Sequence, residues 1–374
     1  MQPITRVIFV RHGRSTFNDQ GRYQGSSNQS VLTAKGIETS QLVGQCLSHA
    51  PIDTIYTSPL QRVQQTTAEI AAQIVHHSPI TVSPDLKEIS LSHWEGLTYA
   101  QVKEQFTSDD NRWQHQPYHF KLLASTESSS SGRVAIAEKP YFPVRDLYQR
   151  ARQFWDKMLA GHAGSTILIV SHSGTIHALL STALGTSPTA HHSLQQSNCG
   201  ISELTITGQS FSQSTVQLHQ LNQTSAIGET LPKLKVSKKG LRLLLLPEND
   251  LSLDSGSPIV EKLKTMPIDF CLSGGNHLEQ LQPIIQNHPK AIWLDAQKSD
   301  FLQDWHRHLC QPRRVAESLM TGLAIAPTHS IQKLLLQVLG GVTNDGSCLS
   351  IYPSHLSVIH YPYTHRPVVQ TINL

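Results

Sequence analysis

The stretch Arg6-Val-Ile-Phe-Val-Arg-His-Gly-Arg-Ser-Thr16 decides the fold. Its apolar run Val7–Val10 predicts a buried strand, and a basic pair with a glycine follows where that strand ends. Short β-rich runs then alternate with amphipathic segments, a pattern typical of helices packed on a mostly parallel sheet. We expect strands at 7–10, 54–56, 80–82, 166–170, 201–205 and 215–218, and helices at 33–48, 60–76, 144–159 and 175–184. The sequence therefore predicts an α/β fold.

A second group of elements repeats this order after residue 240. Residues 242–246 correspond to 6–10, residues 268–273 to 52–57, and residues 323–340 to 168–185. Internal repetition of this kind indicates a duplicated unit, although an unrelated small α/β domain would give a similar pattern. The 374 residues fit two domains. We predict a first domain at 1–225 with an insertion at about 97–143, a linker at 226–239, and a smaller degenerate copy at 240–374.

Composition narrows the class of protein. The chain has 30 Lys and Arg against 27 Asp and Glu, a net charge of +3, so we expect neither nucleic acid nor a membrane surface as partner. No apolar run reaches the length of a membrane span, and the N-terminus shows no targeting segment. Five scattered cysteines without a CxxC pair favour a reducing compartment. We expect a cytoplasmic protein, or a stromal one if it is the mature form of a plastid protein.

Residues suited to phosphate chemistry stand at the ends of the predicted strands. Arg11 offers a planar fork of donors for phosphate, and His12 beside it can act as a nucleophile. A second arginine, Arg62, follows the next strand, and His172 lies on a strand-to-helix turn where backbone N–H groups face an anion. Glu88 lies in the loop before Trp94-Glu-Gly96 and can serve as a proton donor. Two arginines and a protonated His172 would neutralise the phosphoryl charge, so we expect neither a metal nor another cofactor.

The motifs Arg11-His-Gly13, Ser58-Pro-Leu-Gln-Arg62, Leu86-Lys-Glu88 and Ser171-His-Ser-Gly174 together resemble the histidine phosphatase superfamily, over about residues 1–220. This resemblance implies a phosphoglycerate-mutase-like, three-layer α/β/α domain. It implies that His12 becomes a phosphohistidine and that Glu88 is the general acid. The phosphate-binding groups are then expected to be Arg11, Asn18, Gln24, Gly25, Arg62, His172 and Ser173.

Less universal stretches resemble one group within that superfamily. Residues 21–33, 142–152 and 194–200 are similar to the 2-carboxy-D-arabinitol-1-phosphatases, which implies a sugar phosphate that inhibits the carbon-fixing carboxylase. The resemblance makes Arg145 and Asn198 candidate substrate contacts. The segment Asn28-Gln-Ser-Val-Leu-Thr33 lacks the acidic residue common in the family, which weakens any transfer of mutase or bisphosphatase specificity.

Several alternatives stay open at this level. Glu95 competes with Glu88 for the role of the acid. The same pocket would serve a phosphoglycerate mutase or a phosphoserine or general phosphatase. In the second copy, Pro247-Glu-Asn249 replaces the Arg-His-Gly motif, Leu278 falls opposite Arg62 and Pro327 falls opposite His172, so that copy should not be catalytic. A regulatory binding protein acting through this copy is the alternative of another class. The expected partner is a small phosphorylated metabolite, and a homodimer is one option for the assembly.

Overall fold

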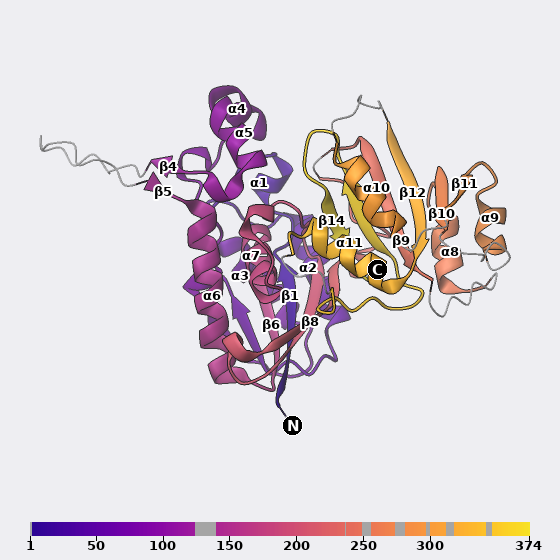
Figure 1. Cartoon of the computed structure of the whole chain (residues 1–374). Helices are drawn as coiled ribbons and strands as arrows, with labels where there is room; N and C mark the ends of the chain where they lie inside the picture. Colours follow the sequence, from indigo (N-terminus) through magenta and orange to yellow (C-terminus); the bar gives the residue numbers. More distant parts are fainter. Residues whose placement is uncertain are drawn as a thin grey trace, which may run out of the picture.

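The computed structural model describes residues 2–123, 140–235, 237–248, 256–273, 281–296, 300–311, 318–341 and 346–374. Within these residues the chain forms two six-stranded sheets that carry helices on their faces. Figure 1 shows the two sheets side by side, the first in indigo to magenta and the second in orange to yellow. The predicted α/β class is confirmed. No helix in the described part of the chain combines the length and apolar character of a membrane span.

The first sheet has the strand order β3-β2-β6-β1-β7-β8. Its strands are β1 (Ile4–Arg11), β2 (Thr54–Thr57), β3 (Ile80–Val82), β6 (Thr166–Ser171), β7 (Ile201–Thr207) and β8 (Thr215–Gln223). The first four in spatial order run parallel, whereas β7 and β8 continue the sheet antiparallel. All six strands expected from the sequence are therefore present, and the carboxyl ends of β1, β2 and β6 meet at one edge.

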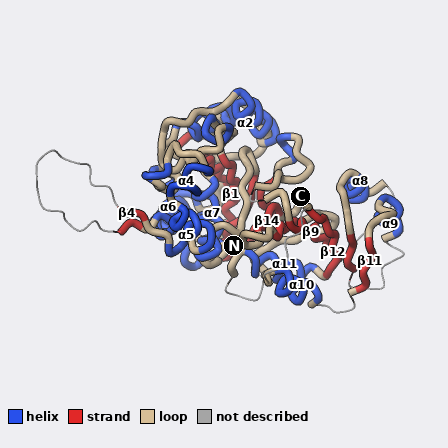
Figure 2. The backbone as a smooth tube through the Cα atoms, turned by 90° about the horizontal axis from the view of Figure 1, so that it is seen from above, coloured by secondary structure: helices blue, strands red, loops and turns tan. Residues whose placement is uncertain are grey.

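Helices cover both faces of this sheet, as the alternation of side chains along β1 requires. Val7 and Phe9 pack into the core with α6 (Pro143–His162) and α7 (Ser173–Ala183). Ile8 and Val10 point the other way, into the core with α2 (Ala34–Cys46) and α3 (Gln61–Ala71). Figure 2 shows α2 and α7 on opposite sides of β1. The result is the expected three-layer α/β/α arrangement, and these four helices are the four predicted ones.

The predicted insertion contains short helices around one buried tryptophan. Its described elements are α4 (Tyr99–Gln105), α5 (Thr107–His115), η3 (Pro117–His119), β4 (Leu122–Leu123) and β5 (Pro140–Tyr141). Trp94 is fully buried and makes ring contacts with Tyr23, Phe106, Trp113 and Phe120. Trp94 lies just before the insertion, and its contacts join the aromatic rings of the insertion to the core of the first sheet.

The second sheet repeats the topology of the first, with the order β11-β10-β12-β9-β13-β14. Its strands are β9 (Gly240–Pro247), β10 (Phe270–Ser273), β11 (Ile292–Asp295), β12 (Leu319–Ala326), β13 (Ser357–Tyr361) and β14 (Val368–Thr371). The strand register pairs Arg11 with Ser171 in the first sheet and Pro247 with Ala326 in the second. Pro327 therefore takes the position of His172, as the sequence comparison predicts. Asn249 and Leu278 lie outside the described residues.

The helices of the second unit are α8 (Pro258–Lys264), α9 (Gln282–Asn287), α10 (Phe301–Leu309) and α11 (Thr328–Val338). The apolar residues of α8 and α9 fill one face of the sheet. Those of α10 and α11 fill the other face, and their core is continuous with the α6 and α7 core of the first sheet. The two units thus share buried apolar surface, although the domain boundaries at 225 and 240 remain a prediction.

Backbone and side-chain hydrogen bonds join the two units beside the loop of residues 194–200. Leu221 and Ile372 exchange a pair of backbone hydrogen bonds, each of 3.2 Å. The amide of Asn222 donates to the carbonyl of Gln370 at 2.7 Å. Gln370 in turn donates to Gln195 Oε1 at 3.2 Å. The last strand of the second unit is therefore part of the support of a loop that belongs to the first.

Candidate active site

Three parallel strands end beside one another at the predicted site. Arg11 ends β1 and pairs with Ser171 at the end of β6, and Thr57 of β2 pairs with Val170 on the other side of β6. The residues that follow, among them His12 and His172, are thereby brought to a common edge. Their rings lie edge to face with centroids 5.3 Å apart. The two histidines predicted from separate motifs do meet.

His12 is held as a neutral imidazole with one nitrogen available. Its Nδ1 lies 2.7 Å from the carbonyl oxygen of Gly13, so Nδ1 carries the proton and donates it, leaving Nε2 as the lone-pair nitrogen. The side chain is 2% exposed. Burial lowers the pKa of His12 well below 6.5, and the charges of Arg11 and Arg62 lower it further. Nε2 is therefore unprotonated at neutral pH, as a nucleophile must be.

His172 is a neutral hydrogen-bond acceptor in this site. Arg62 donates from Nη2 to His172 Nδ1 at 3.2 Å, which leaves the ring proton on Nε2, 2.8 Å from the hydroxyl oxygen of Ser58. Burial lowers the pKa of His172 well below its ordinary value, and the positive charge of Arg62 adds to this effect. The protonated His172 expected from charge counting is therefore not the form that this geometry stabilises.

The two arginines are buried, and each has a nitrogen without a partner. Arg62 is fully buried and donates to the carbonyl oxygens of Ser27 at 2.8 Å and Gly25 at 2.9 Å. Arg11 donates from Nη1 to the carbonyl of Gln196 at 2.8 Å. Within the described part of the chain, Nε of both arginines is buried without a hydrogen-bond partner. Burial lowers the pKa of Arg62 to about 10, which still leaves it charged at neutral pH. Buried unpaired donors of this kind need an acceptor, and the oxygens of a phosphoryl group are suitable ones.

Glu88 and Glu95, the two candidates for the acid, have different hydrogen-bond partners. Glu95 Oε1 accepts hydrogen bonds from the backbone N–H of Ser26 at 2.7 Å and from its hydroxyl at 3.0 Å. A Cβ on Gly25, whose φ is +49°, would lie 2.3 Å from the same oxygen. Glu95 therefore holds the turn that Arg62 also binds, a structural task.

Glu88 lies at the first turn of α7. Its carboxylate accepts from the backbone N–H of Gly174 at 3.1 Å and from the hydroxyl of Thr175 at 3.3 Å. Burial lowers the pKa values of Arg11 and Arg62, and the negative charge of Glu88 offsets part of this lowering, so Glu88 lies within electrostatic range of both arginines. These contacts favour Glu88 over Glu95 as the proton donor.

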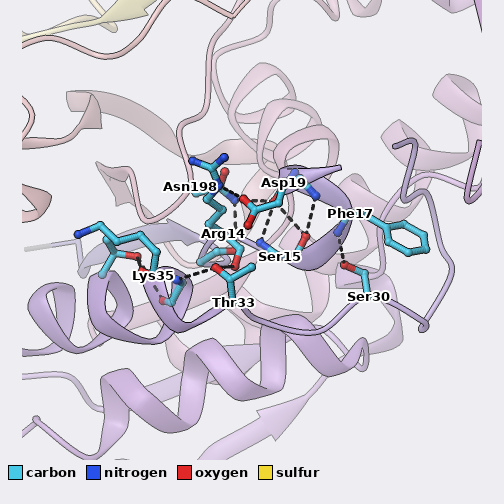
Figure 3. A network of polar contacts seen from close by, with 12 residues as sticks. Arg14, Ser15, Phe17, Asp19, Ser30, Thr33, Lys35 and Asn198 are labelled. Atoms are coloured by element: carbon cyan, nitrogen blue, oxygen red, sulfur yellow. Dashed lines mark hydrogen bonds and ion pairs between the residues drawn. The ribbon is translucent and has the colours of Figure 1, made fainter. Parts of the chain in front are cut away.

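Asn18, Gln24 and Asn198 organise the loop after β1 rather than lying free. Asn18 Oδ1 accepts from the backbone N–H of Ser15 at 3.2 Å and from Asn198 Nδ2 at 3.1 Å. The same Asn198 amide donates to the carbonyl of His12 at 2.9 Å. Gln24 Oε1 accepts from the Ser15 hydroxyl at 2.8 Å. Figure 3 shows Asn198 reaching into this network beside Arg14 and Asp19, which form an ion pair. Asn198 thus holds the backbone at His12, and a substrate contact through Asn198 remains a prediction.

Ser173 lies beside His172, whereas Arg145 binds residues outside the group formed by His12, His172 and the two arginines. Ser173 is the first residue of α7 and directly follows His172, so it lies at the predicted edge. The guanidinium of Arg145 lies over the ring of Phe142 at 4.1 Å, and its Nε donates to the carbonyl of Tyr118 at 3.2 Å. None of the contacts that the structure describes for Arg145 joins it to the phosphate pocket. A substrate contact through Arg145 remains a prediction.

Four residues of the site region were not among the predicted site residues. Thr66 accepts from the Gly13 N–H at 2.9 Å and so fixes the turn beside His12. Arg150 donates to the carbonyl of Lys87 at 2.7 Å and holds the Glu88 loop. Ser58 is the partner of His172 and is visible in the Ser-Pro-Leu motif. The fourth, Lys235, donates to the carbonyl of Gln196, and only the run of lysines in the predicted linker pointed to it.

Two buried histidines of the first domain predict how stability depends on pH. Burial lowers the pKa of His177 to about 3, and nearby His192 adds to the effect; burial and His177 lower the pKa of His191 to about 3. Both take up a proton near pH 6.5 once unfolded, whereas the native state resists protonation. Stability is therefore complete above pH 6.5 and falls between pH 6.5 and 3, by about 2.7 kcal/mol per pH unit for the two groups.

Urea unfolding at pH 7.5, 6.0 and 5.0 measures this slope. His191→Gln should lower stability at pH 7.5 and make the dependence on pH shallower, whereas exposed His76→Gln should leave the slope as it is. A His191 variant with the wild-type slope would show that this histidine does not resist protonation.

Comparison with known proteins agrees with this geometry. The sequence model of the histidine phosphatase superfamily (branch 1) matches residues 7–219. Over 225 residues the chain is 37% identical to an Arabidopsis thaliana protein named "Probable 2-carboxy-D-arabinitol-1-phosphatase", covering 60% of this chain and 43% of that protein. Over 245 residues it is 36% identical to 2-carboxy-D-arabinitol-1-phosphatase of Triticum aestivum, covering 64% of this chain and 45% of that protein. The chain thus spans less than half the length of these two plant relatives.

Among solved structures, the mycobacterial glucosyl-3-phosphoglycerate phosphatase Rv2419c is similar at 21% identity with a TM-score of 0.47. That likeness covers 57% of this chain and 97% of the other.

Proposed function

The chain belongs to the histidine phosphatase superfamily (branch 1), and from this premise we propose that it hydrolyses a small sugar phosphate or sugar-acid phosphate through a phosphohistidine. One observation carries the proposal. A neutral imidazole with its Nε2 unprotonated lies within electrostatic range of two buried guanidinium groups, each with an unpartnered Nε among the described residues. That combination suits attack on a phosphoryl group.

The reaction proceeds in two steps: transfer of the phosphoryl group to His12, and hydrolysis of the phosphohistidine. In the first, the Nε2 lone pair of His12 bonds to phosphorus, the ester P–O bond breaks, and the leaving alkoxide takes a proton from Glu88. In the second, Glu88 accepts a proton from water, the water oxygen bonds to phosphorus, and the P–N bond breaks to release inorganic phosphate and free His12. Arg11 and Arg62 neutralise charge on the phosphoryl oxygens in both transition states. The two guanidinium groups supply this charge without a metal ion, so added metal should not be required.

The substrate class rests on the plant relatives. Both are named for 2-carboxy-D-arabinitol 1-phosphate, a phosphorylated sugar acid. We propose this compound, or a related sugar phosphate that inhibits the carbon-fixing carboxylase, as substrate. The second unit, with Pro247 and Pro327 at the strand ends that correspond to Arg11 and His172, is proposed to take no part in the chemistry.

Phosphate release across a panel tests this proposal. The panel contains 2-carboxyarabinitol 1-phosphate, xylulose 1,5-bisphosphate, 3-phosphoglycerate, phosphoserine and fructose bisphosphate, assayed with a chelator present. We expect the first two to be preferred. A flat profile or a preference for phosphoserine would reject the substrate class. An isomerised product that depends on a bisphosphate primer would identify a mutase. Binding of a protein partner without any turnover would favour a regulatory role.

Glu88→Gln tests the assignment of the acid. We expect cleavage of alkyl phosphates to slow by about 10²–10³-fold, because their leaving group must be protonated. With p-nitrophenyl phosphate, whose leaving group needs little protonation, the initial burst of nitrophenolate should keep nearly its wild-type rate. Rapid-mixing kinetics measures both, and Glu38→Gln, an exposed carboxylate paired with Lys35, is the matched control. Equal losses for the two kinds of substrate would point to another acid.

A further inference from the structure

One side chain outside the motifs of the catalytic domain reaches the wall of the phosphate pocket. Lys235 lies in the segment between the two sheets, and its Nζ donates to the carbonyl oxygen of Gln196. The same oxygen accepts from Arg11 Nη1 at 2.8 Å. Two cations of separate segments thus converge on one neutral acceptor beside the site.

The charge of this lysine is not neutralised locally. Among the described residues no ion pair involves Lys235, and nearby Glu229 is paired with Lys233 at 2.8 Å. The positive charge of Lys235 contributes to the lowered pKa values of His12 and His177, which places the ammonium within electrostatic range of the nucleophile.

Burial of its ammonium, and then the charge of Arg11, lower the pKa of Lys235 well below its ordinary value. The residue nevertheless keeps an exposed surface, so a solute can reach it. A lysine that lies close to another cation and is still accessible to solutes is well placed to bind an anionic ligand.

The guanidinium group of Arg11 has two sides, and they have different partners. In a guanidinium group, Nε–H and Nη2–H project from one edge, which is the edge that binds a phosphoryl group in two-pronged fashion. The Nε of Arg11 is buried without a partner among the described residues. Its Nη1, at the far side of the group, binds the Gln196 oxygen that Lys235 shares. Lys235 therefore lies on the Nη1 side of Arg11, away from the unpartnered Nε.

We propose that Lys235 binds a second anionic group of the substrate, a carboxylate or a second phosphate, while the first phosphoryl group occupies the arginine edge. The proposal rests on the proposed function and deepens it, since it names two-headed anions as the preferred substrates. It also gives the segment between the sheets a place in the site, because Lys235 is supplied from outside residues 7–219 that the family shares.

A matched pair of phosphonates tests this without any turnover. The compound 4-phosphonobutanoate carries a carboxylate at the spacing of a 2-carboxy sugar 1-phosphate, and butylphosphonate carries a methyl group in place of that carboxylate. Isothermal titration calorimetry gives the dissociation constant of each for the full chain. We expect wild type to bind the carboxylated compound more tightly. Lys235→Gln should weaken its binding by about tenfold, the usual size of a hydrogen bond to a charged group, and weaken butylphosphonate far less.

Two further variants sharpen the result. Lys235→Arg keeps the charge and should restore most of the preference. Lys233→Gln removes an exposed neighbouring ammonium whose partner is Glu229, and should leave both dissociation constants unchanged. An equal loss for the two phosphonates, no loss for either, or no preference in wild type would overturn the proposal. Phosphate release from p-nitrophenyl phosphate, measured in parallel, reports separately on the proposed function.

Discussion

Replacing His12 by alanine is expected to lower the rate of phosphate release at least about 10⁴-fold, because the variant has no nitrogen to accept the phosphoryl group. The fold should persist. Among the residues that the structure describes, the side chain makes one hydrogen bond, to the carbonyl of the adjacent Gly13, and an edge contact with His172. The measurement is steady-state phosphate release from the best substrate of the panel, with circular dichroism to confirm folding.

A second readout separates loss of the nucleophile from general damage. Acid-labile phosphate should accumulate on the wild-type chain after rapid quenching and be absent from the His12 variant, since a phosphohistidine hydrolyses in acid. His76→Ala, an exposed histidine on the same domain, should behave as wild type in both assays. Substantial turnover by a pure, folded His12→Ala protein would remove this residue from its assigned role.

Arg62→Ala is expected to have the second largest effect, and to affect both catalysis and stability. The lost guanidinium carries a charge that stabilises the transition state, a loss usually worth about 10²–10³ in kcat. It also leaves the carbonyl oxygens of Gly25 and Ser27 and the Nδ1 of His172 without their donor in the interior. Stability should therefore fall by about 3 kcal/mol.

Two variants identify which property matters. Arg62→Lys keeps the charge but carries all its N–H donors on one nitrogen, so it cannot reach the acceptors that Arg62 binds from two nitrogens; it should recover part of the stability and little of kcat. Exposed Arg112→Ala on α5 is the control for loss of a positive charge, and should change neither quantity. Urea unfolding and phosphate release are measured on the same preparations. A folded Arg62→Ala protein with wild-type kcat would place the phosphoryl group elsewhere.

The sequence predicts the central part of this site well, for a physical reason. Arg11, His12 and His172 each follow an apolar run that can only be a buried strand, and parallel strands gather their carboxyl ends at one edge. Residues distant in sequence are thereby placed side by side by topology alone. The order of the second sheet is predictable for the same reason, because its apolar runs have the same spacing.

The roles of loop residues are harder to predict, because no periodicity constrains a loop. Glu88 and Glu95 both lie in the irregular stretch between β3 and α4. Only their hydrogen bonds distinguish Glu88, the candidate acid, from Glu95, which holds a turn. The protonation of His172 depends on Arg62 donating to Nδ1, an orientation that composition cannot reveal. Lys235 lies in a segment without a pattern, and its position follows from how the two units pack.

The contact between Gln370 and Gln195 has a consequence for how this protein can change over evolution. Gln370 belongs to a strand with no catalytic residue, yet its hydrogen bonds to Asn222 and Gln195 support the loop that carries Asn198, the residue bonded to the His12 carbonyl. A duplicated unit that has lost its own chemistry is usually free to accumulate substitutions. Here we expect purifying selection on the C-terminal strand to track the needs of the other unit's pocket. On this view the strand would be conserved for the support that it gives to the neighbouring loop, and not for any chemistry of its own unit.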